Sequence, residues 1–532
     1  MKKQPPSIFN DVIGPVMRGP SSSHTAAAVR IGRIVRQFFA GNCEKYIVEF
    51  EPQGSLASTY SSQGTDLGLV GGLLGMDTAD SGLLNAHETA RERGLQINFR
   101  ITDYAAVHPN TYRIRAFPAD GKEYCFIFVS TGGGMIELRE MNGNKTEIYG
   151  DFFETMLFLC ETDQSILKGF REIIINEMSD IAFCLINASE SAGLINIKSS
   201  TPLSDAAVSK LKDLTGFNKA VFLDPVLPTL SRKNCKVPFI TAAEILNNQN
   251  TKDLPLYELA LQYESARGGL DEAEVMSTGT KALAVMRGAV EEGLAGTKYT
   301  DRILGPQASQ LANFRGKLIG GKLNKRVITY ITAIMETKSA MGIIVAAPTA
   351  GACAGLPGTL LAVADELGLG ENEAVKGLLA AGLVGVLIAA RSTFAAEESG
   401  CQAECGTSSG MAAAALVQLA GGTAKQAFNA ASIALQNIMG LVCDPVANRV
   451  EVPCLGKNVL AGMNALAAAD MALAGFDPVI PFDETVAALD TVGRLLPAEL
   501  RCTGRAGLSV TPTSLAIAEK MRNLTSGSTE PA

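Results

Sequence analysis

The sequence predicts a small α/β N-terminal domain plus a mostly α-helical C-terminal domain. Three observations support this. A chain of 532 residues is too long for one ordinary hydrophobic core. Strand-like segments that end in Gly-rich turns are confined to the first 237 residues or so. After that point nearly every segment consists of good helix formers with Gly near the ends. The balance of 47% apolar and 19% charged residues is typical of a compact globular protein.

The α/β domain is predicted over residues 1–155. Segments 45–56 (KYIVEFEPQGSL) and 123–134 (EYCFIFVSTGGG) are rich in β-branched and aromatic residues and end in turns, so we expect strands there. Segment 24–41 has apolar residues at helical spacing and a closing Gly41, which predicts a helix.

Residues 156–237 are predicted to form a connecting segment or a small α/β subdomain, with strands near 180–190 and 219–228 and a helix near 203–214. Residues 238–525 form the predicted helical domain, in which Ala is abundant and should allow close helix packing. The clearest helical segments are 241–248, 281–296, 370–392 and 421–442. The polar tail 526–532 is predicted to be disordered.

Charge and hydropathy exclude several functional classes. The net charge of -8 is spread along the chain in both signs, whereas nucleic-acid binding needs a basic face, so we expect no nucleic-acid partner. The two N-terminal lysines are not followed by an apolar segment, which argues against a secretory signal. The apolar run 377–390 is too short to cross a bilayer and predicts a buried helix. We therefore expect a cytoplasmic protein without a membrane partner.

Eleven cysteines in a large chain without a signal argue against a disulfide framework. Cys401, Cys443 and Cys454 each lie beside turn-forming residues. Three thiolates would leave one iron of a four-iron cluster open, as a Lewis acid for a substrate hydroxyl and carboxylate. On these residues alone, packing as small hydrophobic side chains is the favoured reading. Zinc is disfavoured because CxxC pairs and nearby His are missing.

Two loops could bind an anion. In segment 18–32 (RGPSSSHTAAAVRIG) a Gly-Pro turn and three serines precede a helix, whose free N–H groups attract carboxylates or phosphates. The simpler alternative is an N-cap serine beside a hydrogen-bonded histidine. Segment 347–358 (APTAGACAGLPG) is a second Gly-rich turn, but it lacks the Lys-Ser/Thr of a nucleotide-binding P-loop.

Together these motifs resemble the bacterial iron–sulfur L-serine dehydratase family, with its small and catalytic domains fused in one chain. The resemblance covers residues 10–150 and 238–515 and rests on motifs in the same order: GPSSSHT, GSLASTYSSQGTDLGLVGGLLGMD, HPNTYRI, STGGGMI, AAPTAGACAGLPG, GCQAECG, CDPV and VPC. It implies a [4Fe–4S] cluster in which Cys401, Cys443 and Cys454 hold three of the four irons. The fourth iron would meet the substrate carboxylate and hydroxyl.

The resemblance also implies site residues around the cluster. It places the loop Ser21–Ser22–Ser23–His24–Thr25 against the cluster as a substrate pocket, and we predict Thr349 of the second Gly-rich turn as a further substrate-binding residue. Cys405 and Cys353 match no ligand position and are predicted to be structural. A homo-oligomer is expected by likeness to related two-domain enzymes.

The sequence departs from the family pattern at two kinds of position. Gln63 stands where a His is usual, and an amide cannot accept a proton at neutral pH. In the late motif, Cys502 replaces Glu. Any single extra cation in a site motif would typically be a solvated surface charge. Here four occur within such motifs: Arg18, Lys338, Arg449 and Arg505. We predict that Lys338 and Arg449 bind substrate, as an additional substrate carboxylate would require.

These departures favour a hydro-lyase that acts on a small-molecule 3-hydroxy acid other than L-serine. The first prediction is 2-(hydroxymethyl)glutarate, dehydrated to 2-methyleneglutarate in nicotinate degradation. The alternatives are L-serine, converted to pyruvate and ammonia, and a non-catalytic iron–sulfur sensor. For the base that removes the Cα proton, His24 is the first choice and His108 the second. A serine of the loop, with Ser22 and Ser23 predicted as catalytic, is the third. His87 is predicted to be exposed and idle.

Overall fold

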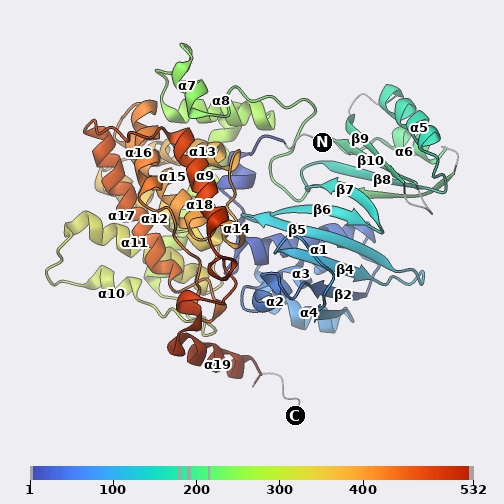
Figure 1. The fold of residues 1–532 in the computed structure, drawn as a ribbon, viewed down its shortest axis with the longest axis horizontal. Coiled ribbons are helices and arrows are strands. Elements are labelled where there is room, and N and C mark those ends of the chain that lie inside the picture. Colours follow the sequence, from blue (N-terminus) through green and yellow to red (C-terminus); the bar gives the residue numbers. More distant parts are fainter. Residues whose placement is uncertain (1–3, 178–180, 189–192, 214–215, 527–532) are drawn as a thin grey trace.

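The computed structural model describes residues 4–177, 181–188, 193–213 and 216–526. The N-terminal half of the chain forms a six-stranded and a four-stranded sheet, and the C-terminal half forms a helical body (Figure 1). This arrangement confirms the predicted fold class.

The first sheet has six strands in the order β3-β2-β4-β5-β6-β7. Strands β2 and β3 are parallel, and every other pair is antiparallel. The strand bounds are β2 Lys45–Phe50, β3 Gln96–Ile101, β4 Thr111–Ala116, β5 Tyr124–Gly132, β6 Met135–Met141 and β7 Asn144–Ile148.

The helices beside this sheet are α1 Ala27–Phe38, α2 Leu56–Thr59, α3 Thr65–Leu74 and α4 Ala86–Glu92. Helices α1 and α3 pack in close contact because Gly72 has no side chain. A Cβ at Gly72 would lie 2.2 Å from the Val29 carbonyl oxygen. The Gly-rich segment of α3 is therefore a helix–helix contact, which holds the start of α1 in place.

The second sheet has the order β11-β8-β10-β9 and is antiparallel throughout. Its elements follow one another as β8 Phe153–Leu159, α5 Gln164–Glu177, β9 Ile181–Ala188, β10 Gly193–Ser199, α6 Asp205–Lys212 and β11 Phe217–Leu223. This βαββαβ unit occupies most of the segment for which the sequence left two alternatives open. The exact domain bounds stay a prediction. The predicted tail lies outside the described residues except for Ser526, which ends α19.

The helical body begins at α7 and contains the largest hydrophobic core. Its helices are α7 Ala242–Asn247, α8 Leu256–Gly268, α9 Glu272–Ala295, α10 Ala308–Asn313, α11 Gly321–Ser339, α12 Gly355–Glu366, α13 Glu371–Ala389, α14 Ala396–Ser399, α15 Thr407–Leu419, α16 Ala424–Gln436, α17 Cys454–Leu473, α18 Phe482–Leu495 and α19 Pro512–Ser526. Among the described residues, only α13 is long and apolar enough to cross a membrane, and 78% of that apolar window is buried inside the protein. This burial agrees with the buried helix predicted for residues 377–390.

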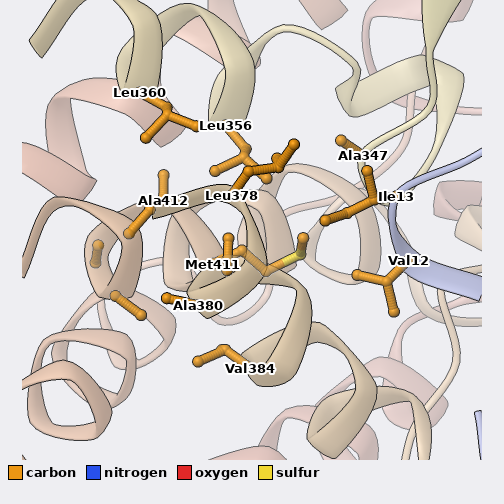
Figure 2. Close-up of a cluster of buried hydrophobic side chains, with 14 of the residues drawn as sticks. Val12, Ile13, Ala347, Leu356, Leu360, Leu378, Ala380, Val384, Met411 and Ala412 are labelled. Carbon is orange, nitrogen blue, oxygen red and sulfur yellow. The ribbon is translucent and has the colours of Figure 1, made fainter. Parts of the chain in front are cut away.

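The N-terminal segment inserts into the helical body. Val12 and Ile13 lie beside Ala347, Leu378 and other side chains of the core (Figure 2). Val12 ends a π-helical turn, η1 Ile8–Val12. The chain then forms a short antiparallel pair between β1 Val16–Met17 and β12 Ile344–Val345. These contacts position the following loop, which contains the three serines and His24, next to the helical body.

Candidate functional site

The three predicted ligand cysteines come from three different segments. Cys401 lies between α14 and a π-helical turn, η5 Gln402–Gly406, and Cys454 is the first residue of α17. Cys443 lies in an extended segment that forms a bridge to Arg501. All three are at most 4% exposed.

The thiols lie close together. The Cys401 and Cys443 sulfurs and a Glu404 carboxylate oxygen are all within 4.8 Å of one another. Asn458 Nδ2 donates to the Cys454 carbonyl at 2.8 Å and lies 3.7 Å from the sulfur of Cys405. Burial and then the charge of Cys401 raise the pKa of Cys454 well above its usual range. A buried set of sulfur donors is what an iron–sulfur cluster requires, so these residues fit the predicted group.

A cation balances the thiols. Lys457 Nζ lies 3.8 Å from Cys401 Sγ and 2.8 Å from Asp444 Oδ1. Although burial alone would lower the pKa of Lys457, the charge of Cys401 and the hydrogen bond to Asp444 raise it, so the side chain stays charged. Its charge favours deprotonated cysteines, which are the form that binds iron.

The serine loop forms a second π-helical turn, η2 Ser22–Ala26, directly before α1. His24 is completely buried, and its two ring nitrogens have different partners. The Thr59 hydroxyl donates to the Ser55 carbonyl (2.7 Å), so it can only accept from His24 Nε2, at 2.9 Å. This assigns the ring proton to Nε2 and the free lone pair to Nδ1. Ser21 Oγ lies 3.0 Å from Nδ1 and donates to it.

Glu397 contacts the same loop. Ser23 Oγ donates to Glu397 Oε1 at 2.8 Å, and His24 Nδ1 is 3.5 Å from that oxygen. Burial lowers the pKa of His24, and the charge of Glu397 opposes this only in part. The imidazole is therefore neutral at pH 7 and can act as a base.

A second carboxylate lies beside the thiols. Glu404 Oε1 accepts from Thr349 Oγ1 at 2.7 Å, and Glu404 Oε2 is 3.9 Å from Cys401 Sγ. Burial raises the pKa of Glu404 to about 7, and the Thr349 hydrogen bond opposes this only in part. The sequence predictions included neither Glu397 nor Glu404, although Glu404 lies within the GCQAECG motif.

Other predicted residues join the parts of the site together. Ser22 Oγ accepts from the Ala350 N–H at 3.1 Å, which ties the serine loop to the second Gly-rich turn. Thr25 Oγ1 donates to the Gln63 carbonyl at 2.9 Å. His108 Nδ1 accepts from the Asn110 N–H, and its Nε2 donates to Glu398 at 2.9 Å. Both nitrogens of His108 thus have partners outside the thiol cluster.

The two cations predicted to bind substrate differ in whether a carboxylate of the protein already pairs with them. Lys338 and Arg449 both line a cavity of about 170 Å³, together with Pro20, Ser61, Ser62, Gly64, Asp66, Leu67, His87, Tyr299, Asp301, Ser339, Met341 and Glu451. Lys338 is fully buried, and within the described part of the chain its ammonium donates one hydrogen bond, to the Val450 carbonyl. Arg449 instead donates to Asp301 Oδ1 at 2.7 Å, so its charge is already neutralised.

The remaining predicted positions are less directly involved. Arg18 donates to the carbonyls of Ala79 and Met341, and Arg505 is near Gln53 at the surface. The His87 side chain is 45% exposed, as predicted, but it lies at the rim of the cavity, 3.5 Å from Asp66.

Comparison with known proteins gives a consistent result. Residues 251–509 match the family model for the serine dehydratase alpha chain, and residues 12–141 match that for the beta chain. A probable L-serine dehydratase alpha chain of Bacillus subtilis (strain 168) is 37% identical over 294 residues, which cover 55% of this chain and 98% of that protein.

The L-serine dehydratase alpha chain of Peptoniphilus asaccharolyticus is also 37% identical, over 51% of this chain and 94% of that protein. A probable L-serine dehydratase beta chain of Bacillus subtilis (strain 168) is 46% identical over 27% of this chain and 64% of that protein. Regions similar to two separate chains are therefore fused here.

Proposed function

The chain belongs to the serine dehydratase family of iron–sulfur hydro-lyases, and we propose that it converts L-serine to pyruvate and ammonia. The comparisons favour this alternative over the first prediction, 2-(hydroxymethyl)glutarate, which they do not support. Location in the cytoplasm and assembly into a homo-oligomer stay predictions.

The observation that carries the proposal is the free carboxylate oxygen of Glu397. Glu397 Oε2 is buried and has no hydrogen-bond partner among the described residues. Its nearest basic group, His24, is neutral for the reason given above. A buried carboxylate without a cation is costly, and the ammonium of an amino acid would supply one. A dicarboxylate without an amino group would leave this oxygen unpaired.

The charges on the opposite side also suit an amino acid. A second substrate carboxylate would need a second cation, but Arg449 is already paired with Asp301. Lys338 remains: it lines the cavity, and among the described residues its ammonium donates to the Val450 carbonyl. We assign Lys338 to the single α-carboxylate of L-serine, with Thr349 as a neighbouring hydroxyl on the cluster side.

Cys401, Cys443 and Cys454 would hold the [4Fe–4S] cluster. When bound, the cluster supplies an open iron whose Lewis acidity assists departure of the substrate hydroxide. The polypeptide supplies the rest: a cation for the carboxylate, an anion for the ammonium, and a base.

We assign proton removal to Ser21 and His24 acting together. His24 has no direct opening to the cavity, but Ser21 donates its hydroxyl proton to Nδ1. As the Cα proton moves to Ser21 Oγ, the serine proton can move to Nδ1, because burial keeps that nitrogen unprotonated. His108 is a weaker choice, because its nitrogens contact Asn110 and Glu398.

The test is an anaerobic assay of L-serine and 2-(hydroxymethyl)glutarate side by side, with wild type and Glu397→Gln. The proposal predicts turnover of L-serine only, with a raised KM in Glu397→Gln because the ammonium loses its charged partner. Glu373→Gln is the matched control, because in the described part of the chain Glu373 lies at the surface and pairs with Lys376 and Asn372. Turnover of the dicarboxylate alone, or an unchanged KM in Glu397→Gln, would refute the assignment.

A further inference from the structure

The serine loop and the second Gly-rich turn leave the same two-stranded ribbon. Strand β1 is followed by the serine loop, and β12 is followed by the turn that contains Thr349. Beside the ribbon, the Gly14 N–H donates to the Ala346 carbonyl at 2.9 Å, and the Ala346 N–H donates to the Pro15 carbonyl at 3.1 Å. The position of β1 therefore determines where Ser21 lies relative to the helical body.

The π-helical turn η1, which precedes β1, packs closely against two glycines of α13. A Cβ at Gly382 would lie 2.6 Å from Ile8 Cγ2, and a Cβ at Gly385 would lie 2.1 Å from Val12 Cγ1. The Ile8 and Val12 side chains are fully buried, and Figure 2 shows Val12 among the side chains of the core. Because a methyl group at either glycine would displace η1, the two elements fit closely in one position.

A buried carboxylate of α8 holds the start of η1. Ser7 Oγ donates to Glu264 Oε1 at 2.5 Å, and the Ile8 N–H donates to Glu264 Oε2 at 2.8 Å. The Ser7 hydroxyl also accepts from the N–H groups of Phe9 and Asn10, so it caps the turn while it donates to the carboxylate. Glu264 is fully buried, and both of its oxygens therefore fix η1 from a position inside the helical body.

Neighbouring groups hold the same N-terminal segment. The Tyr263 hydroxyl donates to the Pro6 carbonyl at 2.9 Å. Asn10 Nδ2 donates to the Thr229 carbonyl at 2.6 Å, and Asn10 Oδ1 accepts from the Thr229 N–H at 2.9 Å. None of these residues lines the cavity to which Lys338 belongs. An effect of this anchor on the reaction must therefore pass through η1 and β1.

We propose that Glu264 is a positioning residue for proton removal. Through Ser7, η1 and β1 it holds the serine loop, so that Ser21 and His24 lie where the Cα proton can be taken. This inference rests on the proposed function, which assigns proton removal to these two residues.

The groups that bind substrate belong to other elements. Lys338 is a residue of α11 and Glu397 is a residue of α14, whereas Ser21 follows β1. A shift of β1 therefore displaces the base and leaves the substrate-binding charges in place. Since misplacement of a reacting group by about 1 Å can cost about 100-fold in rate, Glu264→Gln should lower kcat about 10- to 100-fold. KM for L-serine should change less than about 2-fold, because substrate binding is kept.

The test is steady-state pyruvate formation by the full-length protein with its cluster, under anaerobic conditions and with iron content measured on the same samples. Glu264→Gln keeps the size of the side chain but turns an amide N–H₂ toward one of the two donors. Lys198→Met is the control, because it should lower stability through the four-stranded sheet and keep kcat. An unchanged kcat in Glu264→Gln, an equal fall in Lys198→Met, or a change confined to KM would overturn the proposal.

A second readout reports on proton removal itself. With L-serine that carries deuterium at Cα, the isotope effect on kcat should be larger in Glu264→Gln than in wild type, because proton removal becomes the slow step. An equal isotope effect would show a merely structural role and overturn the proposal. If Glu264→Gln does not fold, Ser7→Ala takes its place: it removes one of the two hydrogen bonds and should lower kcat at unchanged KM, and an unchanged kcat counts against the proposal.

The outcomes separate the two assignments. A wild type that makes pyruvate while Glu264→Gln and Ser7→Ala match it refutes only the positioning role. A wild type with an intact cluster that makes no pyruvate refutes the proposed function, and the positioning role, which is stated for that reaction, fails with it.

Discussion

Replacing Lys338 by Met removes the buried charge of the cavity while it keeps a side chain of similar length. In the structure this ammonium bonds to the Val450 carbonyl, and the assignment above gives it the substrate carboxylate. A hydrogen bond to a charged group contributes about 1.5–3 kcal/mol, so kcat/KM for L-serine should fall about 10- to 150-fold.

The assay is steady-state pyruvate formation under anaerobic conditions, with iron and sulfide content measured on the same samples. Most of the loss should appear in KM, because the carboxylate is bound before and during the reaction. Arg449→Met is the comparison: its charge is held by Asp301, so the effect on KM should be much smaller. An unchanged KM in Lys338→Met, at normal iron content, would refute the role of this residue.

Four further predictions concern the base and the fold. His24→Ala should abolish turnover and leave the visible absorbance of the cluster, and full activity would rule His24 out. Burial lowers the pKa of His24 in the folded protein, so as pH falls below about 6.5 this histidine is protonated in the unfolded chain before it is protonated in the folded one. His24 should therefore lower the free energy of unfolding as pH falls below about 6.5. A melting series that shows the same pH dependence in wild type and in the folded His24→Ala variant would contradict this. Lys198→Met should lower the free energy of unfolding in denaturant by about 3–5 kcal/mol, because the buried Glu154 carboxylate loses its partner at 2.6 Å. A loss below about 1 kcal/mol would contradict this. Gly72→Ala should lower the free energy of unfolding by about 1–3 kcal/mol, because the new methyl group would clash with α1. Gly169→Ala is the control, since Gly169 has open space around it and its replacement should not destabilise the protein. Equal effects of the two substitutions would contradict this.

The cysteines proposed as cluster ligands were predictable because their signal is local. Cys401, Cys443 and Cys454 lie in short turn motifs whose order and residue types are specific. The structure brings the sulfurs of Cys401 and Cys443 together. The serine loop was predictable for the same reason. Glu397 was missed because carboxylates are common on surfaces, and its contact with Ser23 joins residues that are far apart in the chain.

Arg449 shows that a contact between distant residues can also make a sequence prediction wrong. An arginine between two ligand motifs suggested a free cation, but its partner Asp301 is 148 residues earlier in the chain, where the sequence gives no signal. Strand β10 was not predicted because Lys198 and Asn196 break its apolar pattern. Both are buried, and Lys198 pairs with Glu154 of the neighbouring strand.

We propose an L-serine hydro-lyase whose activity depends on a cluster held by Cys401, Cys443 and Cys454. The most direct test is to give anaerobically purified protein L-serine and to measure pyruvate and ammonia before and after exposure to air. We expect equal amounts of pyruvate and ammonia before exposure, and loss of activity together with loss of the cluster after it. A protein with an intact four-iron cluster that forms no pyruvate would contradict it and would favour the non-catalytic sensor.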